Sequence, residues 1–227
     1  KANHLTYLNE YAFKVNMQAG LVNPQKSEIH LVGNPAFDDL LIKNYKKDSL
    51  FKSQLSKQLL YKKSILHIHS HSWVDPKNGS TYQSKESLNE ELSIIYNSCK
   101  ANKVNLLIRP HPSENINIFK KFVKNNPGSY LAYQYSLKEL LNFAEIIIVR
   151  SSTVAIEALY LRKKVIQIDP HLHTDLPITD LNLATGVPLC SKLTKTIFEL
   201  LENNSSLFFK NIELFLPQEA AAPKVSN

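Results

Sequence analysis

The feature that most constrains this sequence is an alternation, from Ser64 onward, of short apolar runs with longer amphipathic stretches. The apolar runs are SILHIHSH, VNLLIRPHP, YLAYQ, EIIIV and KVIQID. Helical spacing follows each of the first four; Leu88, Leu92 and Ile95, for example, share one face of segment 84–104. Strand–helix repeats predict a parallel sheet, and continuous apolar runs indicate strands buried on both faces. The predicted fold is therefore α/β: a Rossmann-like, doubly wound parallel sheet with three α/β/α layers.

The segments on either side of this repeat have a different pattern. Before it, LTYLNEYAFKVNMQAGLV is expected to form helix or turn, IHLVGNP a strand that meets a turn, and SLFKSQLSKQLLYKK an amphipathic lead-in. After it, KLTKTIFELLENN and SSLFFKNIELFL are expected to be helices. We therefore expect residues 1–62 to end one domain and connect it to the next, 63–190 to form the Rossmann-like domain, and 191–227 to be helices and tail. Because the chain does not begin with Met, we expect a fragment or a processed product.

Composition narrows the classes of partner. The formal charge of +7 favours an anionic partner, but the lysines are scattered and no basic run points to nucleic acid. Two cysteines are too few for a disulfide framework or a thiolate zinc site, so a reducing cytoplasm is expected. No apolar run reaches the roughly 20 residues of a membrane span. Five glycines, none in a GxGxxG or Walker pattern, exclude a glycine-rich phosphate loop.

Polar residues follow four of the predicted strands. Because the carboxyl ends of parallel strands meet at one edge of a sheet, we expect these residues to lie close together. They are His69, Ser70, His71 and Ser72; Arg109, Pro110, His111 and Pro112; Arg150, Ser151, Ser152 and Thr153; and Asp169 and His171. Hydroxyl, imidazole and guanidinium groups are donors suited to phosphate oxygens, so a pyrophosphate or phosphodiester ligand would account for them together.

Each of these residues also has a purely structural interpretation. Ser151, Ser152 and Thr153 either cap the following helix or face a phosphate at its start. Arg109 and Arg150 either bind the ligand or pair with carboxylates. His111 is either a ligand donor or a turn residue, and Glu157 either meets a ribose or is solvated.

Three alternating histidines, His67, His69 and His71, share one face of a predicted strand. Such a face can suggest a metal site. No Cys or carboxylate follows at ligand spacing, so no metal is expected here.

Three stretches of the chain resemble the carboxyl-terminal half of the GT-B nucleotide-sugar enzymes: IHLVGNPAFDDL at 29–40, LLIRPHPSEN at 106–115 and EIIIVRSSTVAIEALYLRKKVIQID at 145–169. The His-Pro and paired-serine motifs are similar to those of bacterial capsule and lipopolysaccharide transferases, including those that use CMP-activated acidic sugars. UDP-N-acetylglucosamine 2-epimerases share the Gly-Asn-Pro segment, and CDP-glycerol glycerophosphotransferases share the His-Pro and Ser-Ser-Thr pattern. Ser152 and Thr153 stand where the epimerases have glycines, which puts epimerase second.

The resemblance implies a role for each matching residue. His111 would be the catalytic donor that stabilises the departing nucleotide, and Glu157 would accept from ribose hydroxyls. The remaining residues would bind the donor phosphate (Ser151, Ser152, Thr153, Arg109 and His71) or line the cleft (Gly33, Asn34, His69 and Arg150). The helix dipole would assist phosphate binding. No metal or other cofactor is implied.

The resemblance also implies partners and a place in the cell. The chain would be the donor-binding domain of a glycosyltransferase of surface polysaccharide synthesis, with a CMP- or UDP-linked sugar as donor and a glycan or glycolipid as acceptor. It would act in the cytoplasm or at the inner face of the cytoplasmic membrane. An acceptor domain is expected upstream of Lys1, so the activity of this chain alone is left open. The alternatives are a 2-epimerase-like isomerase, a CDP-glycerol transferase-like enzyme, and a non-catalytic nucleotide-sugar-binding fragment.

Overall fold

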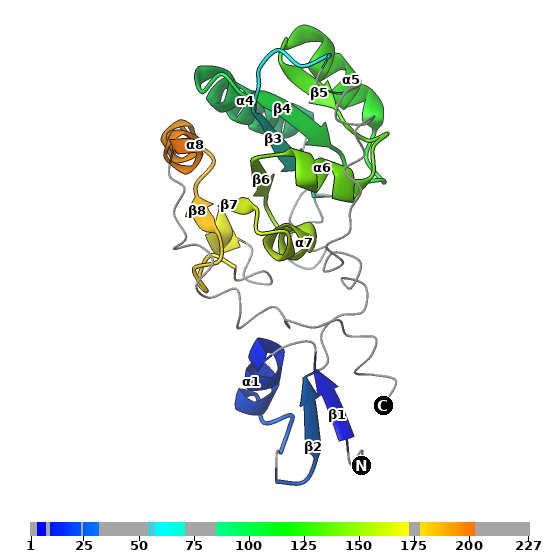
Figure 1. The fold of residues 1–227 in the computed structure, drawn as a ribbon, viewed down its shortest axis with the longest axis vertical. Helices are drawn as coiled ribbons and strands as arrows, with labels where there is room; N and C mark the ends of the chain where they lie inside the picture. Colours follow the sequence, from blue (N-terminus) through cyan, green and yellow to red (C-terminus); the bar gives the residue numbers. More distant parts are fainter. Residues whose placement is uncertain are drawn as a thin grey trace. The chain divides into compact units, whose positions relative to one another are not determined.

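The computed structural model describes residues 4–7, 10–23, 25–31, 55, 57–70, 85–172 and 178–202. These residues fall into two compact units (Figure 1). The residues up to Leu31 belong to one unit and those from Leu55 to Glu202 to the other. The predicted helix within 205–216 lies outside the described residues, as do residues 49–54 and 56 of the predicted amphipathic lead-in.

The smaller unit is a strand–helix–strand motif made of β1 (His4–Tyr7), α1 (Glu10–Gln18) and β2 (Glu28–Leu31). The two strands are parallel, and His4 lies opposite Glu28 in register. Tyr7 and Phe13 join the sheet to the helix, with ring centroids 5.6 Å apart. The predicted strand in IHLVGNP is confirmed over β2, whereas the expectation of helix or turn at residues 5–7 is wrong because these residues extend beside β2.

The larger unit contains a six-stranded sheet in which every neighbouring pair is parallel. Its strand order is β5-β4-β3-β6-β7-β8. The strands are β3 (Ser64–Ile68), β4 (Asn105–Arg109), β5 (Ser129–Leu131), β6 (Ile146–Val149), β7 (Lys164–Ile168) and β8 (Thr185–Val187). The predicted doubly wound parallel sheet is confirmed, with five strands where apolar runs were seen. The sixth, β8, has only three residues and was not predicted.

Helices cover both faces of this sheet (Figure 1). They are α4 (Lys85–Ala101), α5 (Ile116–Asn125), α6 (Leu137–Phe143), α7 (Val154–Tyr160) and α8 (Lys192–Glu202), with a short 3₁₀ turn, η2 (Pro170–Leu172). Helix α4 packs against α8, and α7 packs against β6 and β7. Right-handed crossovers place α4 and α5 on one face and α6 and α7 on the other. Ser136 caps α6 in a reciprocal capping box with Glu139.

The amino-terminal edge of the sheet is held by one buried amide, that of Asn105. Its Oδ1 accepts from the backbone N–H groups of Leu60 and Tyr61, and its Nδ2 donates to the carbonyls of Tyr61 and Lys63 and to Ser64 Oγ. These distances lie between 2.7 and 3.1 Å. Every donor and acceptor of this side chain is therefore used to fix the segment before β3 to the start of β4.

The direction of chain travel through the sheet reverses between β3 and β6. From β3 the chain proceeds outward to β4 and β5, and from β6 it proceeds the other way to β7 and β8. In sheets of this kind, the crevice beyond the carboxyl ends of the strands at the reversal is where ligands bind. The fold thus directs attention to the residues after β3, β4 and β6.

Within the described part of the chain, we find no helix with the length and apolar character that crossing a bilayer requires.

Candidate functional site

A pocket of about 410 Å³ lies at the carboxyl ends of β3, β4 and β6. Its lining is made by three loops: Ile68, His69 and Ser70; Arg109, Pro110, His111 and Pro112; and Ser151, Ser152, Thr153 and Val154. Six residues predicted from the sequence therefore meet here: His69, Arg109, His111, Ser151, Ser152 and Thr153. Arg150 and Glu157 do not line the pocket, and His71, Gly33 and Asn34 lie outside the described residues.

His111 stands exposed at the pocket rim, on the loop between β4 and α5. The backbone N–H of Ser113 donates to its Nδ1 at 3.3 Å, and the Ser113 hydroxyl lies 2.7 Å from the same nitrogen. Because a backbone N–H can only donate, Nδ1 accepts this bond and the ring proton is on Nε2. The loop therefore holds His111 with Nε2–H as its donor.

Arg109 brings a cation to the base of the pocket. Its Nη1 donates to the Tyr135 carbonyl at 2.6 Å, which fixes the guanidinium beside the end of β4. Burial lowers the pKa of Arg109, and the nearby charge of Glu157 opposes that shift. Burial likewise raises the pKa of Glu157, and Arg109 opposes it. Glu157 is thus half-buried beside a pocket-lining arginine rather than solvated.

The serine-rich loop combines the two interpretations weighed for it. Ser152 Oγ accepts from the Val154 N–H at 3.3 Å, which is a capping interaction at the start of α7. Thr153 makes no side-chain cap bond and is exposed at the pocket. Ser70 Oγ donates to the Ser151 carbonyl at 3.0 Å and so ties the β3 loop to the β6 loop. One hydroxyl therefore builds the loop, and another lies on its surface.

Arg150 is held by two carboxylates. Its Nη2 and Nε donate to Glu91 Oε2 at 2.9 and 3.1 Å, and its Nη1 donates to Asp169 Oδ2 at 2.9 Å. Asp169 also accepts from the Leu189 N–H at 2.9 Å. The carboxylate pairing considered from the sequence is the arrangement found for Arg150. Arg150 thereby fixes the start of the serine loop, which follows β6, to Glu91 of α4 and to Asp169 after β7.

Glu91 lies beneath the pocket and is almost fully buried, with 1% of the residue exposed. Its Oε1 lies 3.4 Å from His67 Nε2 and 3.9 Å from His69 Nδ1. Burial would raise the pKa of Glu91, but the two imidazoles and Arg150 outweigh it and hold that pKa well below its usual range. Burial lowers the pKa of His67, with Glu91 opposing. The folded protein therefore favours an anionic Glu91 beside a neutral His67.

Sequence reasoning did not identify Glu91 or Glu114, whose Oε1 lies 3.5 Å from His69 Nε2. A signal for Glu91 was present. It falls between Leu88 and Leu92 on the apolar stripe of α4, where a carboxylate has to find a buried partner. Glu114 lies in the His-Pro loop, where an acidic residue carries no comparable signal.

Two groups of side chains among the described residues have metal-ligand chemistry. One is His67, His69 and Glu91. In this structure the positive charge beside Glu91 comes from the Arg150 guanidinium, so the group is one buried ion pair, Arg150 with Glu91, flanked by two imidazoles. The other group, His4, Glu28 and His30, belongs to the smaller unit.

No protein-family model matches the chain, and no curated protein matches its sequence. Solved structures do match its fold. The UDP-GlcNAc 2-epimerase of Methanocaldococcus jannaschii, in complex with UDP-GlcNAc and UDP, is 22% identical with a TM-score of 0.67, over 99% of this chain and 60% of that one. The wall teichoic acid polymerase TagF, in a variant soaked with CDPG, is 14% identical with a TM-score of 0.64, over 99% and 56%. The UDP-GlcNAc 2-epimerase of Neisseria meningitidis, bound to UDP-GlcNAc, is 16% identical with a TM-score of 0.65, over 99% and 60%.

The chain thus spans 56–60% of the length of these structures. Their likeness confirms the Rossmann-like α/β fold.

Proposed function

We propose that this chain is the donor-binding part of a GT-B glycosyltransferase that builds a bacterial surface polysaccharide from a CMP- or UDP-linked sugar. The observation that carries the proposal is the pocket at the sheet reversal, where Arg109, His111 and the hydroxyl loop 151–153 lie around one space. Neighbours of the same fold are named as complexes with UDP-GlcNAc or CDPG, which supports a nucleotide-activated ligand.

The donor phosphate is assigned to the space between the His-Pro loop and the serine loop. Arg109 supplies a fixed positive charge, and Thr153 and the backbone of the serine loop supply neutral donors. His111 donates from Nε2, because its Nδ1 accepts from Ser113. When the bond between the sugar and the phosphate breaks, negative charge grows on the phosphate oxygens. Donors already in place lower the barrier at that moment because they need not reorganise.

Arg150 acts on this site indirectly, whereas Glu157 is assigned to the ligand itself. Arg150 positions the serine loop through Glu91 and Asp169. Glu157 lies near Arg109, and in this proposal it accepts a hydrogen bond from a ribose hydroxyl of the nucleotide. No metal is assigned to the pocket, since cationic and neutral side chains fill that role.

The proposal assigns the donor side of the reaction to this chain. The acceptor would be a glycan or glycolipid, and the site of action the cytoplasm or the inner face of the membrane. The net charge of +7 fits an anionic acceptor or membrane surface.

A 2-epimerase-like isomerase is the second candidate, favoured by the likeness to the M. jannaschii enzyme at a TM-score of 0.67. Conversion of UDP-GlcNAc to its 2-epimer by the chain without an acceptor would favour the second candidate, since a transferase would not carry out that reaction.

Calorimetric titration with CMP, CDP, UMP and UDP, with and without magnesium, tests the proposal itself. We expect saturable binding of at least one cytidine or uridine nucleotide, unchanged by magnesium. Failure of all four to bind, or binding that requires magnesium, would contradict it.

A further inference from the structure

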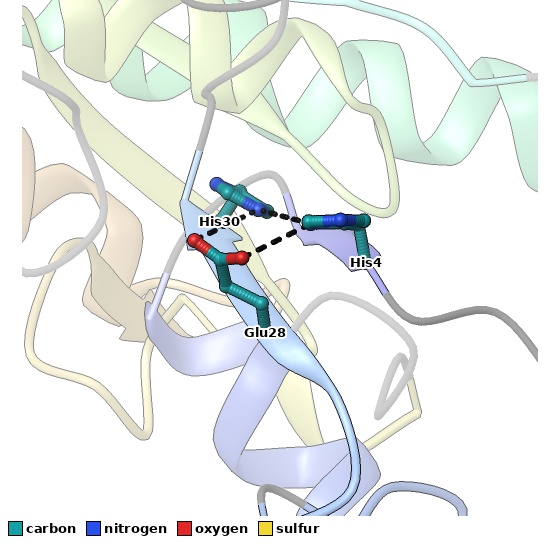
Figure 2. A group of neighbouring side chains, drawn as sticks. All are labelled: His4, Glu28 and His30. Atoms are coloured by element: carbon teal, nitrogen blue, oxygen red, sulfur yellow. Dashed lines mark hydrogen bonds and ion pairs between the residues drawn. The ribbon is translucent and has the colours of Figure 1, made fainter.

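The smaller unit carries three side chains with metal-ligand chemistry that lie together on one face of its two strands: His4, Glu28 and His30 (Figure 2). His4 Nδ1 lies 3.2 Å from His30 Nε2 and 3.2 Å from Glu28 Oε2. His30 Nε2 lies 3.7 Å from Glu28 Oε1. Two imidazole nitrogens and a carboxylate thus converge on one point above the strands.

The strand register produces this convergence. His4 and Glu28 are directly opposite in the parallel pair, and His30 follows Glu28 by two residues, so it returns to the same face. Tyr7 and Phe13 pack together between β1 and α1. A slip of one residue between the strands would move one side of the cluster to the opposite face. The cluster is therefore a consequence of how β1 and β2 pair.

The three separations match those of ligands around a tetrahedral metal ion. Metal–nitrogen and metal–oxygen distances of about 2.0–2.2 Å place ligand atoms roughly 3.3–3.6 Å apart in such a site. His4 Nδ1 lies 3.2 Å from His30 Nε2 and 3.2 Å from Glu28 Oε2, close to that range, and the other carboxylate oxygen, Oε1, lies 3.7 Å from His30 Nε2. One ligand atom from each of the three residues lies within 4.8 Å of the others. Two imidazoles and one carboxylate favour zinc and its neighbours over magnesium or calcium, which prefer all-oxygen sites.

Hydrogen bonds alone do not account for this arrangement of the three side chains. His4 Nδ1 faces both the His30 nitrogen and the Glu28 carboxylate at the same distance, yet it has one lone pair or one proton to offer. A cation is bound by lone pairs from all three groups at once.

We propose that His4, Glu28 and His30 bind a divalent transition metal ion of the zinc type, and that this ion fastens β1 to β2. The side chains are 65%, 64% and 40% exposed, so the fourth coordination position opens to solvent. Each strand has only four residues, and an isolated pair of that length is marginal in water. A metal bridging the strands stabilises the unit and fixes its register. This site is separate from the nucleotide pocket and does not depend on the proposed function.

The test is titration of the purified full chain, without a polyhistidine tag and stripped with a chelator, with Co²⁺. We expect one Co²⁺ per chain with the visible absorption of tetrahedral cobalt, and displacement by one equivalent of Zn²⁺. His30→Ala should weaken binding more than about 100-fold, since even changes to groups behind the ligands cost 10–100-fold. Glu28→Gln, which keeps the shape of the side chain, should weaken it similarly.

Two controls make the result specific. His171→Ala removes an exposed histidine from the other unit and should bind Co²⁺ as the parent does. Circular dichroism of each variant reports whether the fold is retained. The proposal is overturned if the parent shows no saturable Co²⁺ binding, if folded His30→Ala and Glu28→Gln both bind like the parent, or if His67→Ala abolishes binding instead.

Discussion

The two edges of the six-stranded sheet use polar residues in different ways. At the amino-terminal edge, both polar atoms of the Asn105 side chain form hydrogen bonds within the protein. At the carboxyl-terminal edge, polar residues form two tiers. The lower tier, Glu91 with His67 and Arg150, is bonded internally, whereas His111 and Thr153 above it are exposed at a pocket. The polar residue of the first edge stabilises the fold. At the second edge, the buried tier positions the exposed residues of the pocket.

Pocket size alone would lead to the opposite conclusion. A larger hollow, of about 570 Å³, lies at the amino-terminal edge and is lined by Lys62, Lys63 and Lys103 among others. Ligands of doubly wound sheets bind beyond the carboxyl ends of the strands. The smaller pocket, with its convergent donors from three loops, is therefore the better candidate.

The largest effect is expected at the amino-terminal edge. Asn105→Ala removes the five hydrogen bonds of a fully buried side chain and leaves part-buried backbone groups of Leu60 and Tyr61 without this partner, so we expect a loss of about 3–5 kcal/mol in the free energy of unfolding. Urea denaturation measures it. The control Asn142→Ala loses one exposed bond to the Lys138 carbonyl and should change stability by less than about 0.5 kcal/mol. Similar values for the two variants would contradict the structural role of Asn105.

The second largest effect is expected in the buried tier at the carboxyl-terminal edge. Glu91→Gln removes the carboxylate that Arg150 needs, and we expect a loss of about 3 kcal/mol in stability because a half-buried arginine loses a partner. Nucleotide affinity should also fall about 10-fold, since the serine loop is no longer fixed. The neighbouring Glu90→Gln, on the exposed face of α4, is the matched control. Unchanged affinity in folded Glu91→Gln would show that the two tiers are independent.

How much of this was predictable depended on whether the signal was local. The apolar runs that became β3, β4, β6 and β7 are continuous, so the doubly wound parallel α/β fold could be predicted from periodicity. Strands β1 (HLTY) and β8 (TGV) have four and three residues and contain no apolar run, so neither carries a recognisable pattern. The strand-end residues met at one pocket because parallel strands share an edge. The sequence did not show that Arg150 would form ion pairs within the protein, because its partners, Glu91 and Asp169, are distant in sequence.

Acid should weaken the buried tier. Since the folded protein lowers the pKa of His67 and of Glu91, the unfolded chain binds more protons, and stability falls as the pH drops. The contribution of His67 to stability is fully present above its ordinary pKa of 6.5 and declines as the pH falls below that pKa. The contribution of Glu91 to stability is present above its ordinary pKa of 4.5 and is lost at lower pH. Urea denaturation at pH 8, 6 and 5 should show a decline below pH 6.5, and a flat profile across that range would contradict the assignment of His67.

The smallest effects separate the hydroxyls of the serine loop. Ser152→Ala removes the cap of Val154 and should cost about 1 kcal/mol in stability. Thr153→Ala removes an exposed side chain without a cap bond and should change stability by less than about 0.5 kcal/mol. We expect Thr153→Ala to weaken nucleotide binding nonetheless. Equal stability losses would mean that both hydroxyls act as caps.

The most direct test of the central claim is calorimetric titration of CDP and UDP into the parent chain, His111→Ala and Lys62→Ala. His111 lies at the carboxyl-edge pocket and Lys62 at the larger hollow, and both are exposed, so neither change should disturb the fold. If the account is right, the nucleotide that binds the parent binds His111→Ala at least about 10-fold more weakly, as expected for loss of one charge-assisted hydrogen bond, and binds Lys62→Ala unchanged. Loss of binding in Lys62→Ala with His111→Ala unaffected would place the nucleotide at the other edge and contradict it.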